Sequence, residues 1–385
     1  MLPHRGAPIG INKLALWRNI PNPLTSPTHQ RIPGFDLARA YAIFGMYIVN
    51  FNFCFGSFSN TTLAGRFITL FTGNSTSIFI ICAGMGLSLM VSRQGITADD
   101  KKRFKSIVLK RSWFLLAIGL ALYSWWPGDI LHFYGGYMHI AAFLMFVPQR
   151  YYLVAAIAAI AIYHALLFFI PVETAWDFAT FKYADFWTLK GFLRNTLYNG
   201  WNSIFPWIAY FMLGMWLGKL NWQNNTVKKY IFVAGAILLL LFEGLRAIAT
   251  ANMLDIKTTQ YIMSEYFPPY LPFMAITTGF ALMVISACMY IGYKFPTCKL
   301  IIALTKTGQM TLTHYVVHIT LGMVVFAVLF RNTYTGYLPI EEPVPPIYIL
   351  GFATGFFILS VAFSVIWKMY FKNGPLEILM RKISG

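Results

Sequence analysis

Ten long apolar runs constrain this chain more than any other feature of its sequence. A helix that crosses the roughly 30 Å hydrocarbon core of a membrane needs about 20 such residues. The runs cover residues 35–55, 68–91, 112–126, 130–148, 151–171, 201–218, 229–248, 268–292, 301–330 (with one span from about 308) and 347–371. The tails and loops between them leave no room for a soluble catalytic domain. We predict an all-α polytopic membrane protein with about ten transmembrane helices.

The distribution of charge predicts how the chain is oriented. Only 11% of residues are charged, against about 25% in soluble domains, and the net charge is +17. With the N-terminus inside, the inner segments hold 21 Lys and Arg against 3 Asp and Glu, and the outer segments hold 7 against 8. Lys and Arg near span ends stay cytoplasmic, so we expect both termini inside. The surplus of basic residues is then explained by the membrane orientation, without a nucleic-acid partner.

The N-terminal segment and the cysteines carry little chemistry. Residues 1–30 lack the apolar core of a secretory signal, so we expect a cytoplasmic tail before one domain over residues 31–385. The four cysteines show no CxxC spacing, which argues against a disulfide framework or a thiolate metal site. We interpret all four as buried small hydrophobes.

Polar side chains inside the first span are candidate site residues, because an ionisable group in a lipid-facing helix costs about 2.5–3.5 kcal/mol or more. Asp36 and Arg39 are three residues apart and share a helical face, so they can form an ion pair at the inner end or bind a substrate. Asn50 and Asn52 close the same span at its outer end.

The string WWPGDILHFYGGYMH places Asp129 three residues before His132. Asp129 is a good N-cap residue for the helix that follows the Pro-Gly turn. Its carboxylate can also fix the tautomer of the imidazole and raise its basicity, as a base-orienting acid does. The two interpretations, an N-cap beside a hydrogen-bonding histidine and a catalytic pair, stay open at this point.

The ninth span contains His314 and His318, which are four residues apart and able to point the same way. Two histidines at this spacing can bind zinc, but no third ligand or HExxH motif accompanies them, so we predict no metal. Gln309 makes the start of this helix polar. Asn199 and Trp207 belong to the string that opens the sixth span, and we include them as candidate substrate-binding residues.

Helix rise places several of these groups at similar depth. Asn50, Asp129, His132, Asn199 and His318 can meet in the middle-to-outer half of the membrane if their helices touch. The inner segment 92–111 gathers basic residues that include Lys101, Lys102 and Arg103. Such a segment either follows the positive-inside rule and meets anionic lipid heads, or binds a phosphate-rich ligand.

Six strings resemble a known family in the right order. RIPGFDLARAYAIFGMYIVNF (31–51) and NSTSIFIICAGMGLSLM (74–90) are similar to its first two helices. WPGDILHFYG (126–135), NGWNSIFPWIAYFMLGMWLG (199–218), GQMTLTHYVVHIT (308–320) and NGPLEILMRKISG (373–385) are similar to its later motifs. The chain therefore resembles the bacterial heparan-alpha-glucosaminide N-acetyltransferase-like membrane proteins, related to the YeiB-like proteins of domain of unknown function 418.

The resemblance implies a transmembrane acyltransferase-like bundle in a bacterial inner membrane. It implies an acetyl group that moves from cytoplasmic acetyl-CoA to an amine or hydroxyl of an extracytoplasmic glycan or small molecule. The basic segment would meet the CoA phosphates, His132 would act as general base with Asp129 as its orienting acid, and Asn50 would stabilise the oxyanion. Membrane lipids are the other expected partners, and a homodimer is an open alternative.

One departure from the family pattern leaves the base open. Lysosomal relatives have a catalytic histidine in the outer loop after the first span, whereas residues 53–70 contain none. We predict that His132 replaces it, with His318 as the other candidate. A transporter or permease for a small solute or lipid is the alternative function, because polar groups at mid-membrane also suit a substrate path.

Overall fold

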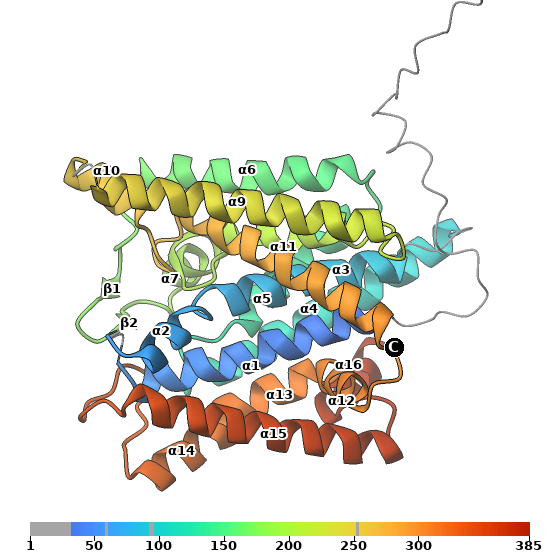
Figure 1. Ribbon diagram of the computed structural model, residues 1–385. Helices are drawn as coiled ribbons and strands as arrows, with labels where there is room; N and C mark the ends of the chain where they lie inside the picture. The colour runs from blue at the N-terminus through green and yellow to red at the C-terminus, as the bar shows by residue number, and fades with distance from the viewer. Residues whose placement is uncertain (1–31, 58–60, 92–95, 252–253) are drawn as a thin grey trace, which may run out of the picture.

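The computed structural model describes residues 32–57, 61–91, 96–251 and 254–385, so the expected N-terminal tail lies outside the described residues. Long helices lie side by side in it (Figure 1). The helices are α1 (Pro33–Phe55), α2 (Leu63–Thr69), α3 (Asn74–Val91), α4 (Ala98–Tyr123), α5 (Leu131–Leu144), α6 (Arg150–Leu167), α7 (Leu189–Arg194), α8 (Ile204–Leu217), α9 (Asn225–Ala251), α10 (Ile256–Ile262), α11 (Leu271–Lys294), α12 (Lys299–Gly308), α13 (Thr311–Val317), α14 (Met323–Phe330), α15 (Pro346–Tyr370) and α16 (Pro375–Ser384).

The all-α polytopic membrane fold is confirmed. Seven helical segments of the described chain are long and apolar enough to cross a membrane: Leu63–Val91, Ala98–Tyr123, Arg150–Leu167, Asn225–Ala251, Leu271–Lys294, Thr311–Phe330 and Pro346–Tyr370. The other three expected runs also form helices, namely α1, α5 and α8. Helix α1 carries Asp36 and Arg39, and α5 and α8 have only 14 residues each.

Helix α1 forms the centre of the bundle, between α11 and α3 on one side and α12, α13 and α15 on the other (Figure 1). Close approach depends on residues without a side chain. A Cβ atom on Gly308 of α12 would lie 1.7 Å from the Asp36 carbonyl oxygen, and one on Gly34 would lie 2.5 Å from the Met289 Cα atom in α11. These contacts hold the N-terminal half of α1 against both neighbours.

Residues 124–130 before α5 and residues 200–203 before α8 are not helical, so both helices are short. A 14-residue helix spans about 21 Å, less than the hydrocarbon thickness. Irregular backbone at membrane depth persists only where protein buries it or where it lines a cavity. Asp129 and Asn202, in the two entering segments, are buried accordingly.

Several boundaries differ from those expected. Helix α4 begins at Ala98, where Thr97 and Asp100 form a reciprocal capping box, so most of the basic segment 92–111 is helix rather than loop. The ninth run is broken at Gln309 and Met310, which separate α12 from α13. The segment between α6 and α8 contains a two-stranded antiparallel sheet, β1 (Trp176–Asp177) and β2 (Lys182–Tyr183).

The cysteine prediction was wrong at one position. Cys54, Cys82 and Cys288 are buried, as expected of small hydrophobes. Cys298 is exposed, because it precedes the first turn of α12, where the chain reaches the surface.

Candidate functional site

A small cavity lies where the two irregular segments meet α1, α3 and α13. Its volume is about 30 Å³, which suits a single water molecule. Asn50 of α1 and Tyr315 of α13 contribute polar atoms to its wall, together with Asn202 before α8 and Tyr266 before α11. The remaining lining residues are Met46, Val49, Ser75, Thr76, Gly128 and Ile130. The non-helical residues before α5 and α8 therefore form part of the wall of this polar cavity.

Asn50 connects the cavity to a buried histidine. Its Nδ2 atom lies 3.0 Å from His318 Nε2. His318 Nδ1 lies 3.2 Å from the His314 carbonyl oxygen, which can only accept, so Nδ1 carries the proton. His318 Nε2 is then the basic nitrogen and accepts from the Asn50 amide. The structure thus brings together two of the predicted catalytic residues, from helices that are distant in sequence.

Tyr315 connects the same cavity to the predicted pair Asp129 and His132. Its hydroxyl donates to Asp129 Oδ1 at 3.2 Å and accepts from the Ile130 backbone N–H at 3.1 Å. Asp129 Oδ2 accepts from the His132 backbone N–H at 3.0 Å and lies 3.3 Å from His132 Nδ1. The Asp129 carboxylate therefore caps a backbone N–H in the first turn of α5, although the N-cap residue is Ile130, and it also contacts the imidazole. The catalytic interpretation of the pair stays a prediction.

His132 lies one layer behind the cavity. The side chain is fully buried, and its ring contacts those of Tyr123, Phe133 and Phe186, with the Tyr123 and Phe186 rings stacked 3.5 Å apart. His132 Nε2 has no hydrogen-bond partner among the described residues. The imidazole is not part of the cavity wall, and its polar connection to the cavity runs through Asp129 and Tyr315.

His314 and His318 bond to different helices. His314 Nε2 lies 2.7 Å from the Ser364 hydroxyl of α15, whereas His318 faces Asn50 of α1. The helix is locally wider here, because α13 is followed by a π-helical turn, η3 (His318–Gly322). Such turns often mark functional sites. The described residues contain no group of three or more His, Cys, Asp or Glu that could hold a metal ion.

A second polar cluster lies where the N-terminal end of α1 meets the C-terminal ends of α12 and α15. Asp36 Oδ1 accepts from Arg39 Nη1 at 3.0 Å, and Asp36 Oδ2 accepts from Gln309 Nε2 at 3.0 Å. Gln309 Oε1 in turn accepts from Lys368 Nζ at 2.8 Å, and Arg39 Nη2 donates to the Cys82 carbonyl at 3.2 Å. The ion pair expected from sequence is present, and this cluster joins the break between α12 and α13 to α1.

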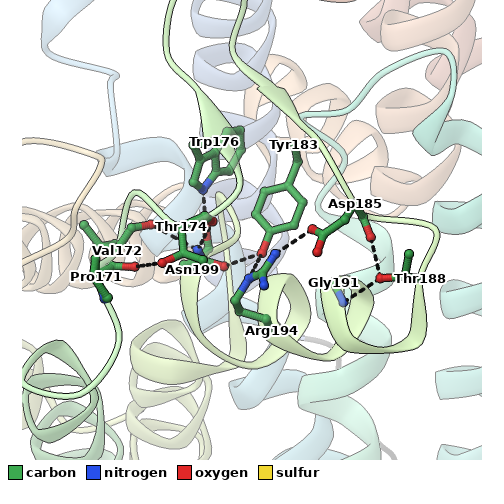
Figure 2. A network of polar contacts seen from close by, with 10 residues as sticks. All are labelled: Pro171, Val172, Thr174, Trp176, Tyr183, Asp185, Thr188, Gly191, Arg194 and Asn199. Atoms are coloured by element: carbon green, nitrogen blue, oxygen red, sulfur yellow. Dashed lines mark hydrogen bonds and ion pairs between the residues drawn. The ribbon is translucent and has the colours of Figure 1, made fainter.

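Asn199 does not line the cavity. It holds the segment between α6 and α8 through the network in Figure 2. It lies in a second π-helical turn, η2 (Asn195–Asn199), and its Nδ2 donates to the Val172 and Thr174 carbonyls at 3.0 and 2.8 Å. Its Oδ1 accepts from the Tyr183 hydroxyl at 2.7 Å, and that hydroxyl accepts from Arg194 Nε at 2.7 Å. Burial raises the pKa of Tyr183, so the hydroxyl keeps its proton for Asn199.

The other predicted binding residues lie apart from the cavity. Asn52 donates to the Ser57 carbonyl and fixes the end of α1. Trp207 is fully buried in α8 and packs its ring against Tyr266, which itself lines the cavity. The exposed residues at the start of α4 form a basic surface at the inner end, and none of them lines the cavity: Lys101, Lys102 and Arg103.

Sequence reasoning missed Tyr315 and Glu377. Tyr315 shares a helical face with His318 three residues later, a spacing that could have identified it. Glu377 of α16 accepts from the backbone N–H groups of Leu312 and Thr313 at 2.8 and 3.2 Å and from the Thr313 hydroxyl at 2.6 Å. It supplies the acceptors that the first turn of α13 lacks. Its sequence position, near the chain end, gives no such signal.

Comparison with protein families gives two matches that overlap. The family model described as heparan-alpha-glucosaminide N-acetyltransferase, catalytic, matches residues 31–240. The model described as protein of unknown function (DUF418) matches residues 211–385. No curated protein matches the chain at a significant level. The first match contains Asn50, Asp129 and His132, and the second contains Tyr315 and His318.

Proposed function

Because the chain belongs to the heparan-alpha-glucosaminide N-acetyltransferase-like family of membrane proteins, which includes DUF418 members, we propose that it is a membrane acetyltransferase. The donor would be acetyl-CoA on the cytoplasmic side. The acceptor would be an amine or hydroxyl of an extracytoplasmic glycan or small molecule, in a bacterial inner membrane.

The observation that carries the proposal is the contact of His318 with Asn50, which forms part of the cavity wall. His318 lies directly behind Asn50. The acceptor loses its proton to His318 Nε2 while its nitrogen or oxygen bonds to the acyl carbon. The carbonyl electron pair moves onto the oxygen, which accepts a hydrogen bond from the Asn50 amide once that amide turns away from His318. The C–S bond then breaks, and the departing thiolate takes the proton from His318.

Asp129, His132 and Tyr315 supply a second hydrogen-bonded chain to the same cavity. In this proposal the Tyr315 hydroxyl orients the acceptor, and Asp129 fixes that hydroxyl. His132 remains the alternative base. Its polar route to the cavity passes through two other side chains, which is why the geometry favours His318.

Basic side chains at the start of α4 suit the phosphates of the acyl donor, whereas the cavity is too small to hold its acyl end. Lys101, Lys102 and Arg103 offer cations for the CoA phosphates on exposed turns of α4. A cavity of about 30 Å³ is too small for an acetyl group with its pantetheine arm. The proposal therefore requires the helices around Asn50 to separate when the donor binds.

Reconstitution in sealed vesicles tests the proposal and separates it from transport. Acetyl-CoA is added on the face that carries Lys101, an amino sugar is trapped on the opposite side, and the trapped product is analysed by mass spectrometry. The proposal predicts an acetylated amino sugar and an equal amount of free CoA. Movement of the amino sugar without loss of the thioester would instead indicate a transporter.

A further inference from the structure

A groove on the lipid-facing side of α9 and α11 is separate from the candidate site. Its volume is about 450 Å³. It is lined by Asn225, Lys228, Lys229 and Phe232 of α9 and by Ser286, Ala287 and Tyr290 of α11. Neither Asn50 nor any other residue of the catalytic proposal belongs to it.

Two glycine contacts explain why the groove opens. A Cβ atom on Gly235 of α9 would lie 2.6 Å from the Gly279 carbonyl oxygen of α11, so the two helices touch there. Further along α11, a Cβ atom on Gly292 would lie 2.6 Å from the Gly34 nitrogen of α1. The end of α11 is thus drawn toward α1 and away from the start of α9. Figure 1 shows the two helices diverging in this direction.

Lysines surround the wide end of the groove. Lys228 is buried, and its Nζ donates to Asn225 Oδ1 at 3.0 Å and lies 4.2 Å from the centre of the Tyr293 ring. Both partners are neutral. Lys229 is exposed beside it, and Lys294 Nζ lies 5.3 Å from the centre of the groove-lining Tyr290 ring. These ammonium groups favour an anion at this end.

A buried hydroxyl lies deeper in the groove. Ser286 is 2% exposed, and its Oγ has no hydrogen-bond partner within the described part of the chain. An unsatisfied buried polar group is costly, so a ligand acceptor at this position stabilises the site. Phe232 and Ala287 give the surrounding wall its apolar character.

We propose that this groove binds one anionic phospholipid. The phosphate lies against Lys228 and Lys229, an ester oxygen of the glycerol region accepts from the Ser286 hydroxyl, and an acyl chain follows Phe232 toward the Gly235 contact. Along α9 the order from the two lysines to Phe232 and then Gly235 is the order from headgroup to acyl chain in such a lipid. A zwitterionic lipid brings its own cation to the lysines and binds less tightly.

Native mass spectrometry of the full chain released from detergent tests the proposal, with phosphatidylglycerol and phosphatidylcholine of identical acyl chains as probes. We expect retention of phosphatidylglycerol alone. The double variant K228Q/K229Q should lower the retained fraction about tenfold or more, because each lysine near a headgroup contributes about 1 kcal/mol. The matched variant K299Q/K382Q removes two exposed lysines of α12 and α16 and should change nothing. Equal retention of both lipids, or equal loss in both variants, would overturn the proposal.

A second pair of measurements tests the groove itself. Ala287→Phe fills the apolar wall without a change of charge and should lower phosphatidylglycerol retention in protein that still elutes as a folded species. Soluble glycerol phosphate at the same concentration should not displace the lipid. Full displacement by glycerol phosphate would contradict an acyl-chain site. Loss of a dimer peak in Ala287→Phe, with phosphatidylglycerol retained, would show that a second copy of the chain fills the groove instead.

Discussion

Asn50 Nδ2 lies 3.0 Å from His318 Nε2 in the middle of the bundle, and Asn50 also forms part of a cavity wall. The contact joins the first span to the ninth and needs the neutral form of His318 with its proton on Nδ1. Acyl transfer requires at least a base and a hydrogen-bond donor, and here the donor Asn50 lies in the cavity wall with the base His318 directly behind it.

Tyr315→Phe should destabilise the fold as well as reduce transfer. In the variant, the Ile130 N–H loses its acceptor and Asp129 Oδ1 loses the donor that the Tyr315 hydroxyl provides. An unsatisfied buried polar group costs about 1–3 kcal/mol. The expected result is a lower midpoint in chemical unfolding. Tyr370→Phe, at a position 76% exposed, is the control and should leave that midpoint unchanged. An unchanged midpoint in Tyr315→Phe would contradict this role of the hydroxyl.

Gly308→Ala should prevent normal packing of α12 on α1. The added Cβ atom would lie 1.7 Å from the Asp36 carbonyl oxygen, a backbone atom that cannot move alone. We expect a large loss of folded protein in size-exclusion chromatography after detergent extraction. Gly351→Ala in α15 has no atom within 4 Å of the new Cβ and should match or slightly exceed the parent protein. Equal yields from the two variants would be evidence against the close contact.

Glu377→Ala should weaken the start of α13, which carries Tyr315 and His318. It removes the acceptor of two backbone N–H groups and one hydroxyl, and loss of a helix cap costs about 0.5–2 kcal/mol. Glu377→Gln keeps one carbonyl acceptor and should lose less. Hydrogen exchange of the Leu312 and Thr313 amides measures the effect directly. Exchange rates that match those of the parent protein in Glu377→Ala would exclude the capping role.

Cys298 reports the orientation of the chain, since it is the exposed cysteine among the four and lies at the end of the bundle that we assign to the cytoplasm. A membrane-impermeant maleimide should label it in inverted vesicles and not in intact cells, with Cys298→Ser as the control. Labelling in intact cells would reverse the predicted topology.

The long helices were predictable from sequence because the cost of exposing backbone to lipid permits few other structures. The pair Asp36 and Arg39 and the pair Asp129 and His132 were predictable from their spacing of three residues. The depth argument predicted that Asn50, Asp129, His132, Asn199 and His318 could meet. The structure brings Asn50 to His318 and Asp129 to His132, but Asn199 belongs to a separate network.

The remaining features depend on information that spacing does not contain. The two π-helical turns, which end at Asn199 and begin at His318, are marked by no periodic pattern in the sequence. The structural role of Asn199 depends on the carbonyls of Val172 and Thr174 in a segment with no regular pattern. Glu377 reaches α13 only because α16 turns back against the bundle.

The rate of acetyl-CoA-dependent release of free CoA by purified protein with an amino sugar tests the central claim most directly. His318→Gln and Asn50→Ala should each lower the rate constant about 10²-fold or more. His164→Gln, which changes a histidine bonded to Tyr261 outside the site, should leave it unchanged. A rate equal to that of the parent protein in His318→Gln, with loss of activity in His132→Gln alone, would contradict the assignment of His318 as the base. No CoA release by the parent protein would contradict the enzyme itself.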